Sequence, residues 1–526
     1  MDTKALRQKI LDLAIRGKLV PQDPNDEPAS VLLERICAEK QQMVKDGKLK
    51  AKDIKNDTVI FKGEDNLHYE KFADGTVKCI EEEIPFELPE GWEWERLGNI
   101  SNIARGGSPR PIESYITDDK SGINWIKIGD TEKDGKYIYT TKEKIKKEGL
   151  SKSRYVESDD FLLTNSMSFG RPYILKTNGC IHDGWLVIGN IKNVFNQDYL
   201  YYALSSNFMY QTLSLLAAGS TVKNLKSDTV KSVLFPIPPM KEQQEIANAV
   251  NRFMEYVVSI EKDKTTLLET IQSTKSKILD LAIRGKLVPQ DSNDEPASVL
   301  LERIRAEKEE LIKLGKIKRD KKESVIFKGE DNSYYEKVGS EVRCIDEELP
   351  FEIPDNWEWV RLWSLFSHNT GKALNSKSQV GSPYKYITTS NLYWNRFELG
   401  NLKQMLFSES ELEKCTVRKG DLLVCEGGDI GRSAIWNYDE EIRIQNHIHR
   451  LRPYTDLNVN FYYYTMYLYK VTDRINGKGI GIQGLSSNQL HTLPLPLPPL
   501  SEQQRITAKI KALFDILDSI ENALIE

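Results

Sequence analysis

The stretch KILDLAIRGKLVPQD occurs twice in this chain, at residues 9–23 and again at residues 277–291. The match continues to residues 36 and 304, and its one difference is Pro24 against Ser292. An internal repeat of this length indicates that one structural unit is present more than once. The stretch therefore predicts a duplicated architecture, and the rest of the sequence shows how far the duplication extends.

Three further blocks recur in the same order. TVIFKGEDN (58–66) returns as SVIFKGEDN (324–332), EEEIPFELPEGWEWERL (81–97) as DEELPFEIPDNWEWVRL (346–362), and PIPPMKEQQEI (236–246) as PLPPLSEQQRI (496–506). Between the last two blocks only fragments match, such as 160–172 with 421–433. The similar ends are expected to meet the same partner or each other, and the divergent middles to meet different partners. Recent duplication or recombination is the alternative explanation of the similarity.

The composition is that of an ordinary globular protein, with 39% hydrophobic and 29% charged residues. No apolar run approaches the roughly 20 residues needed to cross a bilayer. The first residues lack the apolar core of a secretion signal, so we expect a cytoplasmic protein without membrane contact. The six cysteines have no C-x-x-C spacing, which argues against a zinc site or a disulfide framework. The net charge of −5 does not exclude nucleic-acid binding, because a local basic surface is sufficient.

The segment after residue 240 has apolar residues at steps of four and three, which is typical of a long helix with a coiled-coil seam. Gly285 is a suitable end for this helix. The seam residues are Ile246, Val250, Phe253, Val257, Ile260, Leu267, Ile271, Ile278 and Leu281.

The two ends of the chain carry the two parts of a second such seam. The C-terminal segment supplies Ile506, Ile510, Leu513, Leu517, Ile520 and Leu524, and the N-terminal segment resumes the pattern with Leu6, Ile10 and Leu13. We expect the termini to lie next to each other, the rebuilt helix to pack antiparallel on the central one, and the repeat to be circularly permuted. The alternative is two amphipathic helices that each cover their own domain.

The divergent middles mix β-branched and aromatic runs with turns rich in Gly, Asn and Asp, which predicts compact α/β or α+β domains with mostly antiparallel strands. Helices are expected at 198–216 and 459–475, and at 26–43 with Pro28 in the first turn. The tract at 44–80 is expected to be a loop or a short β-ribbon. The predicted segments are 1–84, 85–240, 241–345, 346–500 and 501–526, in an α+β fold of two α/β domains separated by two long antiparallel helices.

Each middle opens with P-x-x-W-E-W-x-x-L, at 89–97 and 354–362, and closes with P-P-[ML]-x-E-Q-Q-x-I. Together with the permuted repeat, these motifs strongly resemble the DNA-specificity (S) subunit of type I restriction–modification systems, over essentially the whole chain. The resemblance implies that each middle is a target-recognition domain reading one half of a bipartite, asymmetric site in double-stranded DNA. It also implies that the helices set the gap between the half-sites and dock two methyltransferase (M) subunits, and through them restriction (R) subunits.

Signals of catalysis are weak. A G-x-G-x-x-G occurs at Gly479, Gly481 and Gly484, but it does not open an apolar helix, and its repeat partner at 217–225 keeps only Gly219. There is no ATP-binding P-loop, no N-P-P-Y-type methyltransferase motif and no hydrolase pattern among the six histidines. We therefore expect no catalytic, cofactor-binding or metal-binding residues. The resemblance to S subunits implies that S-adenosylmethionine, ATP and Mg bind only to the partner subunits.

Candidate DNA contacts are basic, amide and hydroxyl side chains on glycine-rich loops, because these groups bind phosphates and base edges. For each of them a structural or solvated role is the alternative. In the first middle they are Arg105, Ser108, Arg110, Arg171, Ser220, Thr221, Lys223, Asn224 and Lys226. In the second they are Lys372, Asn375, Lys377, Arg432, Gln483, Ser486 and Asn488.

Two other functions compete with a DNA-recognition scaffold. A self-contained DNA-modifying enzyme with a divergent active site would bind S-adenosylmethionine on its own. A coiled-coil adaptor without a role on DNA would show no salt-dependent duplex binding in its complex.

Overall fold

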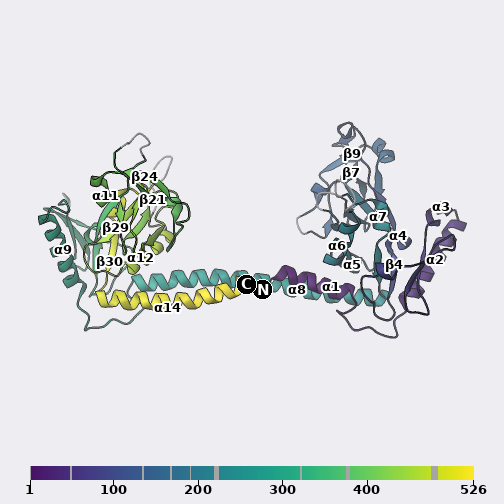
Figure 1. Cartoon of the computed structure of the whole chain (residues 1–526), viewed down its shortest axis with the longest axis horizontal. Helices are drawn as coiled ribbons and strands as arrows, with labels where there is room; N and C mark the ends of the chain where they lie inside the picture. The colour runs from purple at the N-terminus through teal and green to yellow at the C-terminus, as the bar shows by residue number, and fades with distance from the viewer. Residues whose placement is uncertain are drawn as a thin grey trace. The chain divides into compact units, whose positions relative to one another are not determined.

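A computed structural model describes residues 2–47, 50–132, 135–165, 169–189, 191–217, 224–319, 323–374, 380–475 and 484–525. The chain divides into two compact units, Met1–Lys264 and Thr265–Glu526. Both units mix helices and sheets, and each holds one copy of the repeated domain (Figure 1). The expected mixed fold with two repeated domains is therefore confirmed.

The elements follow in nearly the same order in both units. The first unit contains α1 (Thr3–Ile15), α2 (Ala29–Lys45), α3 (Ala51–Ile54), β1 (Val59–Lys62), β2 (His68–Lys71), β3 (Val77–Cys79), β4 (Glu93–Arg96), α4 (Leu97–Ile100), β5 (Asn102–Arg105), β6 (Ile116–Thr117), β7 (Ile123–Ile126), β8 (Tyr137–Ile138), β9 (Glu143–Ile145), β10 (Arg154–Val156), β11 (Phe161–Thr164), β12 (Pro172–Leu175), β13 (Gly179–Ile181), β14 (Trp185–Gly189), α5 (Gln197–Leu204), α6 (Asn207–Leu216), α7 (Ser227–Lys231) and β15 (Leu234–Ile237). Helix α8 (Met240–Ile283) begins in this unit and ends in the second.

The second unit continues with α9 (Ala297–Lys313), β16 (Ser324–Lys328), β17 (Tyr334–Val338), β18 (Glu341–Cys344), β19 (Glu358–Arg361), α10 (Leu362–Leu365), β20 (Phe366–Thr370), β21 (Ser382–Ile387), β22 (Leu392–Tyr393), β23 (Arg396–Phe397), β24 (Lys403–Phe407), α11 (Glu409–Cys415), β25 (Thr416–Val417), β26 (Leu422–Cys425), β27 (Ser433–Ile435), β28 (Ile442–Ile444), β29 (Ile448–Pro453), α12 (Val459–Val471), α13 (Ser487–His491), β30 (Pro494–Leu497) and α14 (Leu500–Ile525). Elements β4–β15 lie inside the predicted 85–240 segment, and β19–β30 lie inside 346–500.

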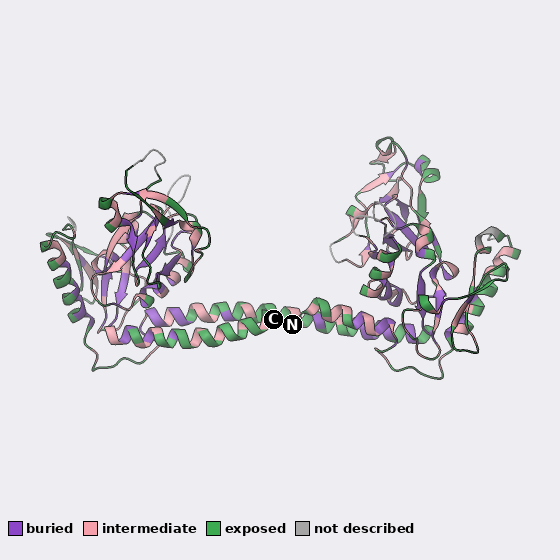
Figure 2. Ribbon diagram, in the orientation of Figure 1, coloured by how far each residue is buried: buried purple, intermediate pink, exposed green. Residues whose placement is uncertain are grey.

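Each divergent middle is built around two sheets of four or five strands, and two-stranded sheets (β4-β15 in the first unit, β19-β30 and β22-β23 in the second) accompany them. The first unit has the strand orders β5-β14-β11-β12-β8 and β10-β13-β7-β9-β6, and the second has β20-β29-β26-β27 and β24-β21-β28-β25. The pairing is mostly antiparallel, as expected, with parallel exceptions at β8–β12, β7–β13 and β21–β28. The apolar runs of β11 and β26 are buried along their whole length. Buried strands gather in the middle of each domain (Figure 2). One scaffold therefore carries two dissimilar sequences.

Inside each unit a terminal helix runs antiparallel to the part of α8 in that unit (Figure 1). Arg7 binds Glu261 at 2.9 Å and Gln22 binds Glu242 at 3.0 Å, so residue numbers rise on one chain segment as they fall on the other. In the second unit Lys275 binds Glu521 at 2.7 Å and Gln290 binds Glu502 at 2.6 Å, with the same polarity. The approach of the two termini, the continuous coiled coil and the circular permutation stay predictions.

The seam differs from the expected heptad pattern at three residues. Phe253, Leu267 and Ile520 are each 41% exposed, although they were expected to lie in the seam. Ile246, Val250 and Val257 are buried, and Met254 packs against their core in place of Phe253. The spacing 246, 250, 254, 257 follows the face of a 3.6-residue helix, and position 253 falls outside the face that α1 covers.

The Trp and Glu-Gln-Gln motifs meet in one repeated joint. The Trp92 indole donates to Glu242 at 2.8 Å, and Gln22 donates to the same carboxylate and to the Gly17 carbonyl. The counterparts in the second unit are Trp357 on Glu502 at 2.9 Å, with Gln290 bound to Glu502 and to the Gly285 carbonyl. Burial raises the pKa of both Glu242 and Glu502. The motifs therefore attach each domain to its helix pair and to its copy of the repeated stretch, at 9–23 or 277–291.

The next glutamine of the motif holds the helix that follows the central sheet. In the first unit Gln243 accepts from the Asn196 backbone N–H at 2.8 Å, and Asn196 caps α5. In the second unit Gln503 accepts from the Asn458 N–H at 3.1 Å, and Asn458 caps α12. Both glutamine side chains are fully buried, which explains why the E-Q-Q spacing is shared.

Three local expectations need correction. The helix expected over 198–216 is two helices, α5 and α6, because the Ser206 hydroxyl accepts from the Met209 N–H and starts a new helix there. Pro28 lies at the N-cap of α2 rather than inside its first turn. The tract at 44–80 forms α3 and a three-stranded sheet, β1-β2-β3, rather than a loop or simple ribbon.

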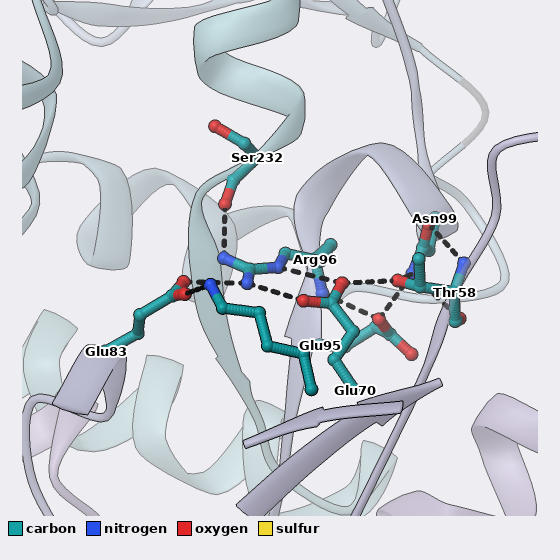
Figure 3. Close-up of polar contacts among 8 residues, drawn as sticks. Thr58, Glu70, Glu83, Glu95, Arg96, Asn99 and Ser232 are labelled. Carbon is teal, nitrogen blue, oxygen red and sulfur yellow. Dashed lines mark hydrogen bonds and ion pairs between the residues drawn. The ribbon is translucent and has the colours of Figure 1, made fainter. Parts of the chain in front are cut away.

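A buried ionic network joins this three-stranded sheet to the domain (Figure 3). Arg96 binds Glu70 and Glu83 at 2.7 and 2.8 Å, and it also donates to the Ser232 carbonyl at 2.8 Å. Glu95 lies beside the network and accepts from Asn99 at 2.7 Å. In the second unit Arg361 binds Glu336 and Glu348 and donates to the Thr492 carbonyl. The second unit has Val360 where the first has Glu95.

We expect Glu95→Gln to stabilise the first unit at pH 8 and to leave its stability near pH 4.5 unchanged. Burial raises the pKa of Glu95 to about 7, so the folded state binds more protons than the unfolded state between pH 4.5 and 7. Stability therefore falls as pH rises through that window, by on the order of 3 kcal/mol. Hydrogen exchange of β4 in both forms at the two pH values measures the difference. A gain that is equal at both would contradict a titrating Glu95.

Candidate nucleic-acid interface

The candidate interface of the first domain is the loop edge where β5 ends. The chain leaves β5 at Arg105 and crosses the end of β13 at Gly106, where a Cβ atom would lie 2.2 Å from the His182 carbonyl oxygen. The same crossing recurs after β20, where a Cβ on Gly371 would lie 2.1 Å from the Ile444 oxygen. Glycine is needed at both positions because no side chain fits against the neighbouring backbone.

Three of the predicted residues converge on Asp183, in the turn between β13 and β14. The Ser108 hydroxyl donates to its carboxylate at 2.7 Å, and Arg110 approaches the other oxygen at 3.5 Å. The Arg105 guanidinium donates to the Asp183 carbonyl at 3.0 Å. The bond from Ser108 holds the pKa of Asp183 below its usual range. Arg105 and Arg110 are exposed, and the Arg110 side chain is 82% accessible, so both can reach a ligand.

Asn165 joins this edge to the loop that precedes α7, and the sequence did not identify it. Its buried side chain donates to the Asp183 carbonyl at 2.7 Å, and its own carbonyl accepts from the Leu225 N–H at 3.0 Å. Asn224 and Lys226 flank Leu225, and Lys226 is exposed. Arg171 is half-buried, with its guanidinium 5.5 Å from the Tyr173 ring. The edge therefore groups one carboxylate, several amides and several cations.

The corresponding edge of the second domain has the same backbone contacts and different side chains. The Leu485 N–H donates to the Glu426 carbonyl at 2.7 Å, as Leu225 does to Asn165. A carboxylate thus replaces an amide, and the His447 ring lies 3.8 Å from it. Arg432 corresponds to Arg171, and it is half-buried, donates to the Thr389 carbonyl at 2.6 Å and covers the Tyr393 ring. Ser486 caps α13, and Asn488 on that helix is exposed.

Lys372 was expected to contact DNA, but its side chain is mostly buried inside the second domain. Its ammonium group donates to the Leu406 carbonyl at 2.9 Å and to Glu411 at 2.6 Å, and its side chain is only 10% exposed. The bond from Lys372 lowers the pKa of Glu411 to about 2. Lys372 therefore fastens α11 to the edge. The remaining candidates Ser220, Thr221, Lys223, Asn375, Lys377 and Gln483 lie outside the described residues.

Three histidines form a chain under the second edge. His449 donates Nε2–H to the Leu485 carbonyl at 2.8 Å, because a carbonyl can only accept. Its Nδ1 then accepts from His368 Nε2 at 2.8 Å, and His368 Nδ1 accepts from His491 Nε2 at 2.7 Å. Burial lowers the pKa of His368 to about 3 and that of His449 to about 4, so these two rings stay neutral near pH 7. Leu485 precedes α13 and His491 ends it, so the chain anchors both ends of α13 to β20 and β29.

The part of the chain that the structure describes contains no cluster of His, Cys, Asp or Glu that could hold a metal ion. Among the same residues, none of the helices combines the length and the apolar character of a membrane span. What the edges offer is hydrogen-bond donors and acceptors on loops positioned by rigid strands, an arrangement common in binding sites.

Comparisons with known proteins give the family of this chain. The model of the type I restriction modification DNA specificity domain matches residues 89–270 and 354–526. The specificity subunit of the type I restriction enzyme EcoAI of Escherichia coli is 29% identical, over 98% of this chain and 90% of its own length. The EcoEI specificity subunit of the same species is 28% identical, over 99% of this chain and 90% of its own length.

A solved structure shares the fold. The crystal structure of the HsdS subunit from Thermoanaerobacter tengcongensis has a TM-score of 0.52 and 16% identity, with 84% of this chain and 93% of that chain covered. The match of the domain model to both divergent middles and to both E-Q-Q motifs covers more than half of the sequence. This chain therefore belongs to the family of type I restriction modification DNA specificity domain proteins.

Proposed function

We propose that this chain is the sequence-recognition subunit of a type I restriction–modification complex, and that its two domains read the two halves of a bipartite, asymmetric site in double-stranded DNA. It docks two methyltransferase subunits and, through them, restriction subunits. It has no catalytic residues of its own, and S-adenosylmethionine, ATP and Mg bind to the partner subunits.

One observation carries the proposal. The two domains place the same backbone positions at the same edge, joined by the same bonds from Leu225 to Asn165 and from Leu485 to Glu426. The side chains at these positions differ, with an amide in one domain and a carboxylate in the other. A scaffold that is kept while its edge chemistry changes is suited to reading two different base sequences, since base edges are distinguished by donor and acceptor patterns. The joints that fasten each domain are alike, which suits two copies of one partner.

Reconstitution separates this function from an autonomous enzyme. The chain with the type I methyltransferase subunit of the same genome should transfer methyl groups to one split duplex motif. The chain alone should neither methylate DNA nor bind S-adenosylmethionine in equilibrium dialysis. Binding of S-adenosylmethionine by the isolated chain would favour the enzyme alternative, and a complex without salt-dependent duplex binding would favour the adaptor.

We expect Arg105→Ala and Arg110→Ala each to reduce the slope of log K against log salt concentration by about one if the residue neutralises a phosphate. Both side chains lie at the first edge and are exposed. Fluorescence anisotropy of the assembled complex on its duplex, between 50 and 200 mM salt, measures the slope. The matched control is Arg35→Ala, which removes an exposed arginine of α2 that pairs with Glu27. If the slope of log K against log salt concentration were the same for all three variants, the DNA would bind away from the first edge.

A further inference from the structure

The three-stranded sheets β1-β2-β3 and β16-β17-β18 have one buried and one exposed face. Ile60 lies on the buried face with Trp94, and Ile326 lies in the same way with Trp359. Side chains alternate between the faces of a strand, so Val59 and Phe61 project from the other face of β1. The cross-strand pairs Phe61–Tyr69–Cys79 and Val59–Lys71–Val77 define that exposed face.

The exposed face is the same in both units, and we call it the V-F-Y face. It consists of Val59, Phe61, Tyr69, Lys71, Val77 and Cys79 in the first unit, and of Val325, Phe327, Tyr335, Lys337, Val342 and Cys344 in the second. Phe61 and Phe327 are both 40% exposed, and Val77 and Val342 are both 53% exposed. The two aromatic rings of each face stack on each other, with ring centroids 5.8 Å apart for Phe61–Tyr69 and 5.9 Å apart for Phe327–Tyr335.

Duplication alone does not account for the repeated face. The turn that joins the second and third strands differs in sequence, with Asp74 and Gly75 in one unit and Gly339 and Ser340 in the other. It also differs in length, because the paired residues are Lys71 with Val77 in the first unit but Lys337 with Val342 in the second. The six facing side chains are unchanged across this difference. Exposed valine and phenylalanine on a rigid sheet favour association with another surface.

We propose that each V-F-Y face is a docking surface for one copy of the same partner protein, bound twice per chain. The partner presents an apolar surface with a basic edge. On the function proposed above, on which this inference rests, that partner is the methyltransferase subunit. The two faces give the duplicated part of the chain two equivalent places to hold two identical subunits.

Each face carries one exposed cation, Lys71 or Lys337, but the charges at the turn between its first two strands are acidic and favour a protein over a nucleic acid. The Tyr69 hydroxyl donates to Asp65 at 2.7 Å and the Tyr335 hydroxyl to Asp331 at 2.9 Å, so a carboxylate lies next to each aromatic pair. Glu64 and Glu330 are exposed neighbours of these carboxylates. In the first unit a shallow depression of about 410 Å³ is lined by Phe61, Gly63, Glu64, Asp65, Tyr69 and Val77. Acidic groups repel phosphates and attract lysine or arginine on a protein partner.

The test uses the full chain with the type I methyltransferase subunit of the same genome. The variants are Phe61→Glu, Phe327→Glu and both together. Native mass spectrometry should show two methyltransferase subunits on the parent chain, one on each single variant and none on the double variant at 1 µM, with at least a tenfold loss of affinity at the changed face. The matched control is Leu314→Asp, because Leu314 is 65% exposed at the end of α9 and its counterpart in the first unit is Asp46.

A second readout does not depend on substitution. Cys79 and Cys344 lie on the two faces and are exposed, so maleimide labelling located by peptide mass spectrometry should slow at least fivefold at both when the subunits bind. Exposed Cys37 on α2 is the internal reference. A parent chain that binds no methyltransferase overturns the proposed function and this inference with it. Two bound subunits on every variant, with unchanged labelling at Cys79 and Cys344, overturn the inference alone. Lost duplex affinity with intact subunit binding would assign the face to DNA.

Discussion

Arg361→Met should destabilise the second unit by about 3–5 kcal/mol, because it leaves a buried carboxylate without its main partner. The Arg361 side chain is 4% exposed, and Glu336 beside it is 5% exposed. Arg361 binds both Glu336 oxygens, at 2.9 and 2.7 Å, and also Glu348 at 2.7 Å. The matched substitution Arg96→Met in the first unit should cost less, since the Arg96 side chain is itself 14% exposed.

The pH dependence of this variant has a definite sign. Burial alone would raise the pKa of Glu336, but hydrogen bonds, first of all from Arg361, lower it to about 2. A depressed pKa contributes stability that is present above about pH 4.5 and is lost as pH falls towards 2. The difference between Arg361→Met and the parent should therefore be greatest near pH 7 and should shrink below pH 4.5.

Hydrogen exchange of β17 and β19 measures the effect locally, because a chain of two units does not unfold in one step. The double variant Arg361→Met with Glu336→Leu removes both charges, and it should recover most of the lost stability. A loss below 1 kcal/mol for Arg361→Met, or no recovery in the double variant, would contradict a network held together by this buried pair.

Trp357→Ala should cost the second unit about 3–5 kcal/mol, since it removes a large buried side chain from the joint. Trp357 is 3% exposed, packs edge-on against Phe461 and lies against Gly285, where a Cβ atom would be 3.1 Å from its ring. Loss of the ring opens a cavity between α12, the identical stretch and the start of α14.

Trp357→Phe separates packing from hydrogen bonding. It keeps most of the aromatic surface and removes the bond to Glu502, so it should cost only about 1–3 kcal/mol. Exchange protection at the starts of α12 and α14 is the readout. Trp92→Ala should have a similar effect in the first unit, and the two should add, because the joints share no residues. Equal costs for Trp357→Ala and Trp357→Phe would show that the bond, and not the ring, holds the joint.

The duplication was predictable because the two halves of the sequence share long matching blocks in the same order. Each Trp motif and each E-Q-Q motif could be matched with its copy in the other half of the chain. The structure explains the E-Q-Q spacing through the hydrogen bonds of Glu242 and Gln243. The two-sheet domains with mostly antiparallel strands followed from turn and strand patterns. The seam was less predictable, because a heptad count assigns Phe253 to a face that α1 does not cover.

The edge chemistry depended on tertiary structure. Ser108 and Asp183 are far apart in sequence, and no local pattern connects them. The chain of His368, His449 and His491 is likewise assembled by the sheet and α13. From the sequence, the position of Lys372 directly after a glycine suggested a lysine that contacts DNA. Only the fold shows that its ammonium group pairs with Glu411. Asn165 and Glu426 were visible as the residues after a matched strand, but their role appears only through the bonds to Leu225 and Leu485.

The most direct test of the account is a methylome comparison. Cells carrying this chain and its methyltransferase subunit are sequenced beside cells that lack only this chain, and beside cells in which residues 85–240 are replaced by the corresponding domain of a relative. We expect a split, asymmetric adenine-methylated motif that vanishes with the deletion and changes in one half only with the replacement. An unchanged methylome after deletion of the expressed chain, or a replacement that alters both halves at once, would contradict recognition by two separate domains.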